Sequence, residues 1–141
     1  MTITISEHVS APIETTWLCY TDPAHIIHWN FASSDWCCPS AQNDLVVGGK
    51  YVARMEAKDG SMGFDFEATY LEINHHSHFS YQIADGRIVH VRFSEISSTS
   101  CRIEVEFEAE NVNPADLQRA GWQSILTNFK RYTDALAKQT D

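Results

Sequence analysis

The sequence lacks the features that mark several large classes of protein. No apolar run approaches the roughly 20 residues that a membrane-spanning helix needs, so we expect no membrane span. The first residues, MTITISEHV, contain neither the basic region nor the apolar region of a signal peptide, and we expect none. Lys and Arg number only 10 against 19 Asp and Glu, and the formal charge of −9 argues against nucleic acid as a partner.

Motifs that carry catalysis or hold cofactors are also missing. The sequence shows no nucleophile elbow, paired-carboxylate motif, phosphate-binding loop or dinucleotide fingerprint. We therefore assign no catalytic residue and expect no cofactor; enzymatic activity stays undecided, with simple binding favoured over catalysis.

Cysteine and histidine are present without the spacing of a metal site. The four cysteines show no CxxC spacing, and free thiols in a reducing cytoplasm are the simplest interpretation of Cys19, Cys37, Cys38 and Cys101. Two groups of histidines lie in a predicted turn and on a short predicted helix, without enough nearby ligands for zinc. We expect surface histidines and no metal at His25, His28, His75, His76 and His78.

What the sequence does have is the composition of one globular domain, which we expect to span residues 1–141 with 43% hydrophobic residues. The longest amphipathic stretch runs from Asn113 to Lys138. Asn113 suits the N-cap and Pro114 the first helical position. Apolar or small residues recur every three or four positions and form a wide stripe, which needs a concave surface to cover it: Leu117, Gly121, Trp122, Ile125, Leu126, Phe129, Tyr132 and Leu136.

The preceding residues supply the elements of such a surface. Residues 2–9 alternate as a half-buried strand, and two short helices follow, from Pro12 to about Tyr20 and from Asp22-Pro23 to near Trp29. Ser33 to Asn43 is polar and is predicted to be a loop. From Leu45 onward, turn residues separate runs of alternating apolar residues, as in an antiparallel meander.

The turn at Asp59-Gly60 predicts a strand register that agrees with the hydrophobic pattern. A two-residue hairpin there places three pairs on one face, namely Met55 with Phe64, Ala53 with Phe66, and Tyr51 with Ala68.

The turn at Asp85-Gly86 leaves two registers open. A three-residue loop, Ala84 to Gly86, aligns Tyr81 with Val89 and leaves His90 and Arg92 outside. A two-residue loop would turn His90 and Arg92 inward. The hydrophobic pattern favours the first register.

Together these elements predict an α+β fold: one strand, two short helices, about six antiparallel strands and a long C-terminal helix packed on a curved sheet. Four stretches carry a resemblance to a known family: WNFASSDW (Trp29 to Trp36), DLVVGG (Asp44 to Gly49), MEAKDGSMGFDF (Met55 to Phe66) and NPADLQRAGWQSILTNFKRY (Asn113 to Tyr132). The chain resembles the bacterial homologues of the activator of the heat-shock-protein-90 ATPase, a branch of the START-like (SRPBCC, Bet v-like) superfamily.

The resemblance covers nearly the whole chain and implies a helix-grip fold, in which a curved antiparallel sheet wraps the C-terminal helix. It also implies a cavity between sheet and helix, which in this superfamily typically takes hydrophobic small molecules. Carriers, sensors and enzymes share this scaffold, so the fold alone does not decide the function.

Residues of three kinds are candidates for ligand binding in that cavity. Tryptophans offer a large apolar face with one donor, other apolar residues form the inner sheet wall, and two helix residues interrupt the apolar stripe. Gln118 needs a hydrogen-bond partner, which can be a ligand, water or backbone near the helix start. The candidates are Trp29, Trp36, Met55, Phe64, Phe66, Tyr81, Phe107, Gln118, Gly121 and Trp122.

The sequence therefore predicts a cytoplasmic protein that binds a hydrophobic or amphipathic small molecule. One alternative is a chaperone accessory factor similar to the activator of the heat-shock-protein-90 ATPase. Another is a polyketide-cyclase-like enzyme or a hydrolase.

Overall fold

Seven strands and three helices follow one another in the computed structural model, which describes residues 1–139. The order of elements is β1 (Thr2–Val9), α1 (Ile13–Thr21), α2 (Pro23–Ile26), β2 (Trp36–Asn43), β3 (Lys50–Ala57), β4 (Gly63–Asn74), β5 (His78–Ile83), β6 (Ile88–Ser97), β7 (Ser100–Glu108) and α3 (Ala115–Gln139). The predicted α+β fold with its long C-terminal helix is confirmed. No helix within residues 1–139 is both long enough and apolar enough to cross a membrane.

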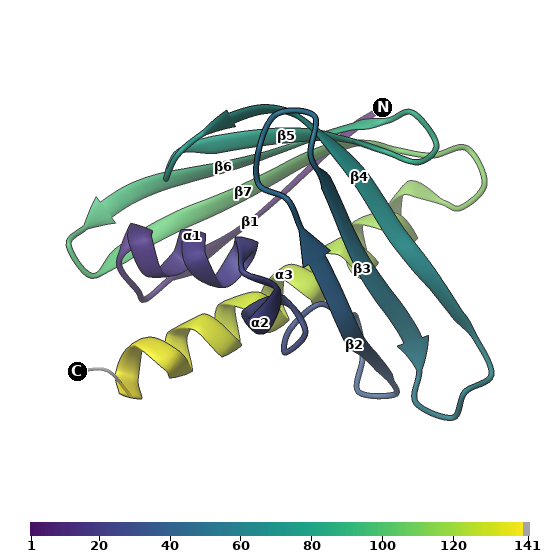
Figure 1. The fold of residues 1–141 in the computed structure, drawn as a ribbon, viewed down its shortest axis with the longest axis horizontal. Helices are drawn as coiled ribbons and strands as arrows, with labels where there is room; N and C mark the ends of the chain where they lie inside the picture. Colours follow the sequence, from purple (N-terminus) through teal and green to yellow (C-terminus); the bar gives the residue numbers. More distant parts are fainter. Residues whose placement is uncertain (140–141) are drawn as a thin grey trace.

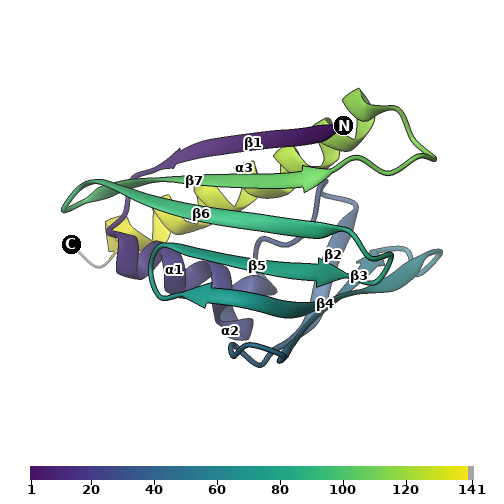
Figure 2. The ribbon, with the colours of Figure 1, turned by 90° about the horizontal axis from the view of Figure 1, so that it is seen from above.

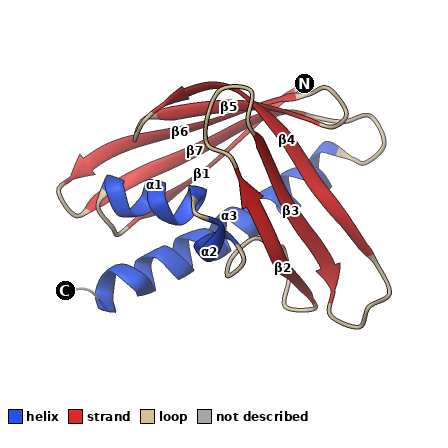
Figure 3. Ribbon diagram, in the orientation of Figure 1, coloured by secondary structure: helices blue, strands red, loops and turns tan. Residues whose placement is uncertain are grey.

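The strands form one antiparallel sheet in the order β1-β7-β6-β5-β4-β3-β2. Strands β2 to β7 form a simple meander, whereas β1 pairs with β7 at the opposite edge from β2. The sheet curves around the helices, which all lie on its concave side (Figure 1; Figure 3, helices in blue). Seen from above, α3 runs beneath the strands (Figure 2). This is the predicted helix-grip arrangement.

Both predicted registers are confirmed. Met55 faces Phe64 across β3 and β4, as the Asp59-Gly60 turn requires. Tyr81 faces Val89 across β5 and β6, and a hydrogen bond from Ile83 N to Arg87 O (2.9 Å) closes the three-residue loop. Strand alternation then leaves His90 opposite Glu106 and Arg92 opposite Glu104 on the outer face of the sheet.

The prediction of a loop over Ser33 to Asn43 was wrong, because β2 occupies Trp36–Asn43. The register of β2 against β3 shifts between Cys37 and Ser40, so the alternation of buried and exposed residues is broken. Pro39 lies inside the strand, which is tolerated because β2 is an edge strand. A bulge and a proline together remove the pattern by which a strand is recognised.

The start of α3 also differs from the prediction. The helix begins at Ala115, and the Asn113 side chain donates to Glu110 Oε1 (2.7 Å) instead of capping the helix. Leu117, predicted to lie in the inward stripe, is 60% exposed. Gln118 takes the inward position in this turn, because its side chain bonds to the loop that precedes the helix.

An aromatic core packs between α1, α3 and strands β5 and β6. The Trp17 ring lies 5.0 Å from that of Phe93, and the Tyr20 ring lies 5.0 Å from that of Phe129. Phe79 contacts both α1 rings and is 1% exposed. This core fixes α1 and the middle of α3 against the sheet.

Candidate functional site

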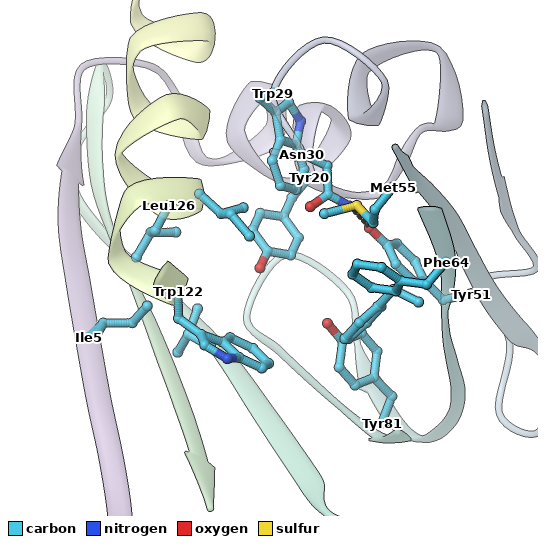
Figure 4. A pocket seen from close by; sticks show the side chains of 13 residues that line it. Ile5, Tyr20, Trp29, Asn30, Tyr51, Met55, Phe64, Tyr81, Trp122 and Leu126 are labelled. Atoms are coloured by element: carbon cyan, nitrogen blue, oxygen red, sulfur yellow. Dashed lines mark hydrogen bonds between the residues drawn. The ribbon is translucent and has the colours of Figure 1, made fainter. Parts of the chain in front are cut away.

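A cavity of about 200 Å³ lies between α3 and the inner face of the sheet. Its wall comes from β1, β3, β4, β5 and β7, from α1 and the turn after α2, and from α3 (Figure 4). The lining residues are Ile5, Tyr20, Trp29, Asn30, Tyr51, Met55, Phe64, Phe66, Tyr81, Val105, Trp122, Ile125 and Leu126.

The sheet side of the cavity follows from strand alternation. Tyr51 and Met55 lie four residues apart on β3, and Phe64 and Phe66 lie two apart on β4, so each pair points to one face. Phe64 is 50% exposed and marks the rim of the cavity, where its ring lies 6.1 Å from that of Trp36. The rim is therefore aromatic and open to the outside.

The helix side is formed mainly by Trp122, Ile125 and Leu126. The Trp122 ring stacks on Phe107, with 4.1 Å between ring centroids and an interplanar angle of 15°. It also meets Phe66 edge to face at 6.3 Å. Phe107 thus lies behind Trp122 and holds its indole plane against the cavity, a geometry in which aromatic pairs contribute beyond their buried area.

The two lining residues from the turn after α2 are already hydrogen-bonded. Trp29 Nε1 donates to the Cys19 carbonyl oxygen (2.9 Å), so this indole offers the cavity its apolar surface. Asn30 is 7% exposed and its Nδ2 donates to the Tyr51 hydroxyl (3.0 Å).

Tyr20 and Tyr81 bring hydroxyl groups to the cavity that have no such partner. Neither hydroxyl forms a hydrogen bond with any residue in the part of the chain that the structure describes. Figure 4 shows both hydroxyls pointing into the space between α3 and the sheet. Burial raises the pKa of both phenols well above the usual value, so both stay neutral donors at physiological pH.

The structure brings together some of the predicted ligand-binding residues and separates others. Those on the cavity are Trp29, Met55, Phe64, Phe66, Tyr81 and Trp122. Four lie outside the lining. Trp36 contacts Phe64 at the rim, and Phe107 supports Trp122 from behind.

Gln118 and Gly121 are the other two. Gln118 Oε1 accepts from Glu110 N (2.8 Å), and its Nε2 donates to the Asn113 carbonyl oxygen (2.7 Å), which satisfies the side chain with backbone near the helix start. A Cβ added at Gly121 would meet no atom within 4 Å. This position therefore borders open space, although it does not line the cavity.

Sequence reasoning missed several lining residues for different reasons. Tyr51 was already predicted to share a face with Met55, and that pattern could have identified it. Tyr20 and Asn30 come from the segment around the short helices, whose position on the sheet depends on contacts between distant residues. The Asn30–Tyr51 hydrogen bond, for example, spans 21 residues. Local periodicity carries no signal for such a contact.

The histidines and cysteines lie away from this cavity. His25 Nδ1 lies 2.6 Å from the Tyr132 hydroxyl, and the His28 ring stacks on the same tyrosine. His75 and His76 pack edge-on against Trp17. Within residues 1–139, no group of three potential ligands is arranged to hold a metal ion. Burial raises the pKa of the Cys38 thiol to about 11, which leaves it protonated and unreactive.

Comparison with known proteins shows which family and which solved structures this chain is similar to. Residues 10–134 match the family described as Activator of Hsp90 ATPase homolog 1-like protein. An AHSA1-like protein from Aeromonas hydrophila is 42% identical, with a TM-score of 0.89 over 96% of this chain and 94% of that one. A protein from Cytophaga hutchinsonii is also 42% identical, with a TM-score of 0.81 over 97% and 94% of the two chains.

More distant structures share the fold alone. A protein from Chromobacterium violaceum has a TM-score of 0.82 at 22% identity, and the match covers 98% of each chain. No curated protein matches the sequence significantly. The resemblance drawn from the sequence motifs is confirmed by the family match and by these structures.

Proposed function

The chain belongs to the family of Activator of Hsp90 ATPase homolog 1-like proteins, a branch of the START-like superfamily, and we propose that it binds a small apolar or amphipathic molecule between α3 and the sheet. One observation carries this proposal: an aromatic cavity lies between helix and sheet. Ligand sites are typically concave and apolar with a few placed polar groups, and this cavity has that composition.

The composition of the lining supports binding over catalysis. Within the described chain, none of the residues that line the cavity is Asp, Glu, Lys, Arg, His or Cys. General acid–base catalysis needs a titratable group within hydrogen-bond reach of the substrate, with a pKa near the working pH. The tyrosine hydroxyls do not meet this requirement, because their pKa values are raised. His90 and Arg92, which could have supplied such groups, lie on the outer face.

The ligand is expected to be small. Ligand pockets usually measure about 300–1,000 Å³, and a dry cavity of about 150 Å³ accommodates benzene. A cavity of about 200 Å³ with an open aromatic rim suits a bicyclic or short-chain molecule. We also propose that the protein is cytoplasmic, because its four cysteines are free thiols, as is usual in a reducing compartment.

The test uses a neutral apolar dye and two matched tryptophan variants. N-phenyl-1-naphthylamine should bind the folded protein saturably, at about one site. Trp122→Ala removes one wall of the cavity and should weaken binding about tenfold, equivalent to about 1.4 kcal/mol. Trp36→Ala removes a tryptophan that lies outside the lining and should change the affinity little. A folded protein that takes up no dye, or equal losses in the two variants, would contradict the proposal.

A second candidate function rests on the family match. Because the family is named for an activator of the Hsp90 ATPase, this chain can also be proposed to act on such a chaperone through its surface. Its formal charge of −9 would make the contact sensitive to salt. The measurement is the ATPase rate of a bacterial homologue of this chaperone with and without the protein. An unchanged rate at saturating protein would exclude activation.

A further inference from the structure

The polar groups of the cavity indicate which chemical class of ligand it can bind. The inference drawn from them rests on the proposed function, the binding of a small molecule in this cavity. We infer that the ligand is uncharged and carries a hydrogen-bond acceptor, such as a carbonyl oxygen, that accepts hydrogen bonds from the Tyr20 and Tyr81 hydroxyls.

The first reason is that two donors face the cavity unpaired. Among the described residues, the fully buried side-chain polar atom that lacks a hydrogen-bond partner is Thr133 Oγ1. The oxygens of Tyr20 and Tyr81 also lack partners, yet they are not fully enclosed, so what they contact is the cavity space. A ligand without an acceptor would cover both hydroxyls and leave their O–H protons unsatisfied, which weakens its binding.

The second reason is that the described lining cannot compensate a negative charge. Among residues 1–139, no basic side chain lines the cavity, so a carboxylate would lose its hydration without gaining an ion pair. The formal charge of −9 on the whole chain also disfavours anions. A fatty acid anion or an aromatic carboxylate is therefore a poor ligand for this site.

A cation is the remaining alternative, because aromatic rings attract cations. Two arrangements disfavour it here. One face of the Trp122 indole is already covered by Phe107, and no acidic side chain of the described residues lines the cavity to neutralise the charge. A cationic head group also offers no acceptor to the two hydroxyls. An uncharged ligand with an acceptor forms hydrogen bonds with the two hydroxyls and needs no counter-charge from the lining.

Two neighbouring tyrosines differ from Tyr20 and Tyr81, because their hydroxyl oxygens already take part in hydrogen bonds. The Tyr51 hydroxyl accepts from Asn30 Nδ2 (3.0 Å), and the Tyr70 hydroxyl donates to Asn43 Oδ1 (2.8 Å). Tyr70 does not line the cavity. It therefore serves as a matched control, since Tyr70→Phe removes a hydroxyl that is already satisfied elsewhere.

The experiment compares four naphthalene probes of similar size by NMR titration of the folded protein. 2-Acetylnaphthalene carries an uncharged acceptor, 2-isopropenylnaphthalene replaces its oxygen by a CH₂ group, 2-naphthoate is an anion, and a naphthyl trimethylammonium ion is a cation. The ketone should bind about tenfold tighter than the hydrocarbon, as expected for one or two hydrogen bonds. Both ions should bind more weakly than the ketone.

Three tyrosine variants test which hydroxyl groups donate to the acceptor of the ligand. Tyr20→Phe and Tyr81→Phe should each reduce the preference for the ketone, because the ketone loses a hydrogen bond and the hydrocarbon no longer covers an unsatisfied hydroxyl. Tyr70→Phe should retain the full preference. Urea midpoints establish that each variant is folded. If the hydrocarbon binds as well as the ketone, or if either ion binds more tightly, the ligand class is wrong while the binding function stands. If no probe binds to the folded protein, both proposals fail.

Discussion

Two parts of the same sheet meet the helices in different ways. Around α1, along β5 and β6, aromatic side chains from α1, α3 and the strands interlock, and Phe79 lies in contact with Trp17 and Tyr20. Strands β3 and β4 cross the direction of those strands in Figure 1, and a cavity separates their inner face from α3. We call these the filled part and the hollow part of the sheet.

The sequences of the two parts follow the same rule, which is the alternation of inward apolar and outward polar residues. In the filled part the inward residues meet partners, whereas in the hollow part Phe64 and Phe66 face a space that Trp122 only partly fills. Alternation therefore decides which side chains point inward, and the curvature of the sheet decides whether anything meets them there. The following predictions test this distinction, beginning with the largest effect.

The first prediction compares two phenylalanines of the two parts. Phe79 is 1% exposed in the filled part, so Phe79→Ala should lower the free energy of unfolding by about 3–5 kcal/mol. Phe64 is 50% exposed at the cavity rim, and Phe64→Ala should lower it by about 1 kcal/mol or less. Urea denaturation of both variants measures the difference. Equal losses would mean that the rim is packed as tightly as the core.

The second prediction adds one methylene group to each of two paired valines, one in the filled part of the sheet and one at the cavity. Val91 and Val105 face each other across β6 and β7, but only Val105 lines the cavity. Val91→Ile should overpack the core and cost about 1–3 kcal/mol. Val105→Ile extends into vacant space and should change stability by less than about 1 kcal/mol, while weakening the binding of N-phenyl-1-naphthylamine.

The same denaturation and dye measurements decide this comparison. A Val105→Ile variant that is as unstable as Val91→Ile would show that the cavity does not extend to β7. Unchanged dye affinity in a stable Val105→Ile variant would show that the ligand binds farther toward the rim.

Sequence reasoning succeeded where local chemistry decides the structure. The Asp59-Gly60 turn and the alternation around it both required Met55 opposite Phe64, so either signal alone would have given the register. It failed at β2, where a bulge and Pro39 hide the alternation. It also failed at Leu117, because the inward direction in the first turn of α3 is set by hydrogen bonds of Gln118 to the preceding loop.

The candidate site shows the same limit. Residues such as Phe66 and Trp122 could be placed on the inner faces of a strand and a helix from periodicity. The unpaired hydroxyl of Tyr20 could not, because α1 is positioned by its contacts with Phe79 and Phe129. The positions of the polar groups that select the ligand thus depend on tertiary packing, which a single sequence does not reveal.

The smallest expected effect concerns Gly121, on the helix side of the hollow part. Glycine inside a helix costs about 1 kcal/mol relative to alanine, and two causes could offset this cost. If the sheet approached α3 closely, the methyl group of Gly121→Ala would overpack and destabilise the fold. A Cβ at this position meets no atom within 4 Å, so close approach is not the cause. Gly121→Ala should therefore raise the free energy of unfolding by about 0.5–1 kcal/mol.

The neighbouring exposed Ala120 provides the reverse control, since Ala120→Gly should lower the stability by about 1 kcal/mol. Because Gly121 lies outside the lining, Gly121→Ala should leave the affinity for N-phenyl-1-naphthylamine unchanged. Weaker binding in the stabilised variant would show that the ligand extends past Trp122 toward the start of α3, so that the missing side chain makes room for it. A lower urea midpoint for Gly121→Ala would instead mean that the helix and sheet are closer in solution, and the hollow part would be smaller than the structure shows.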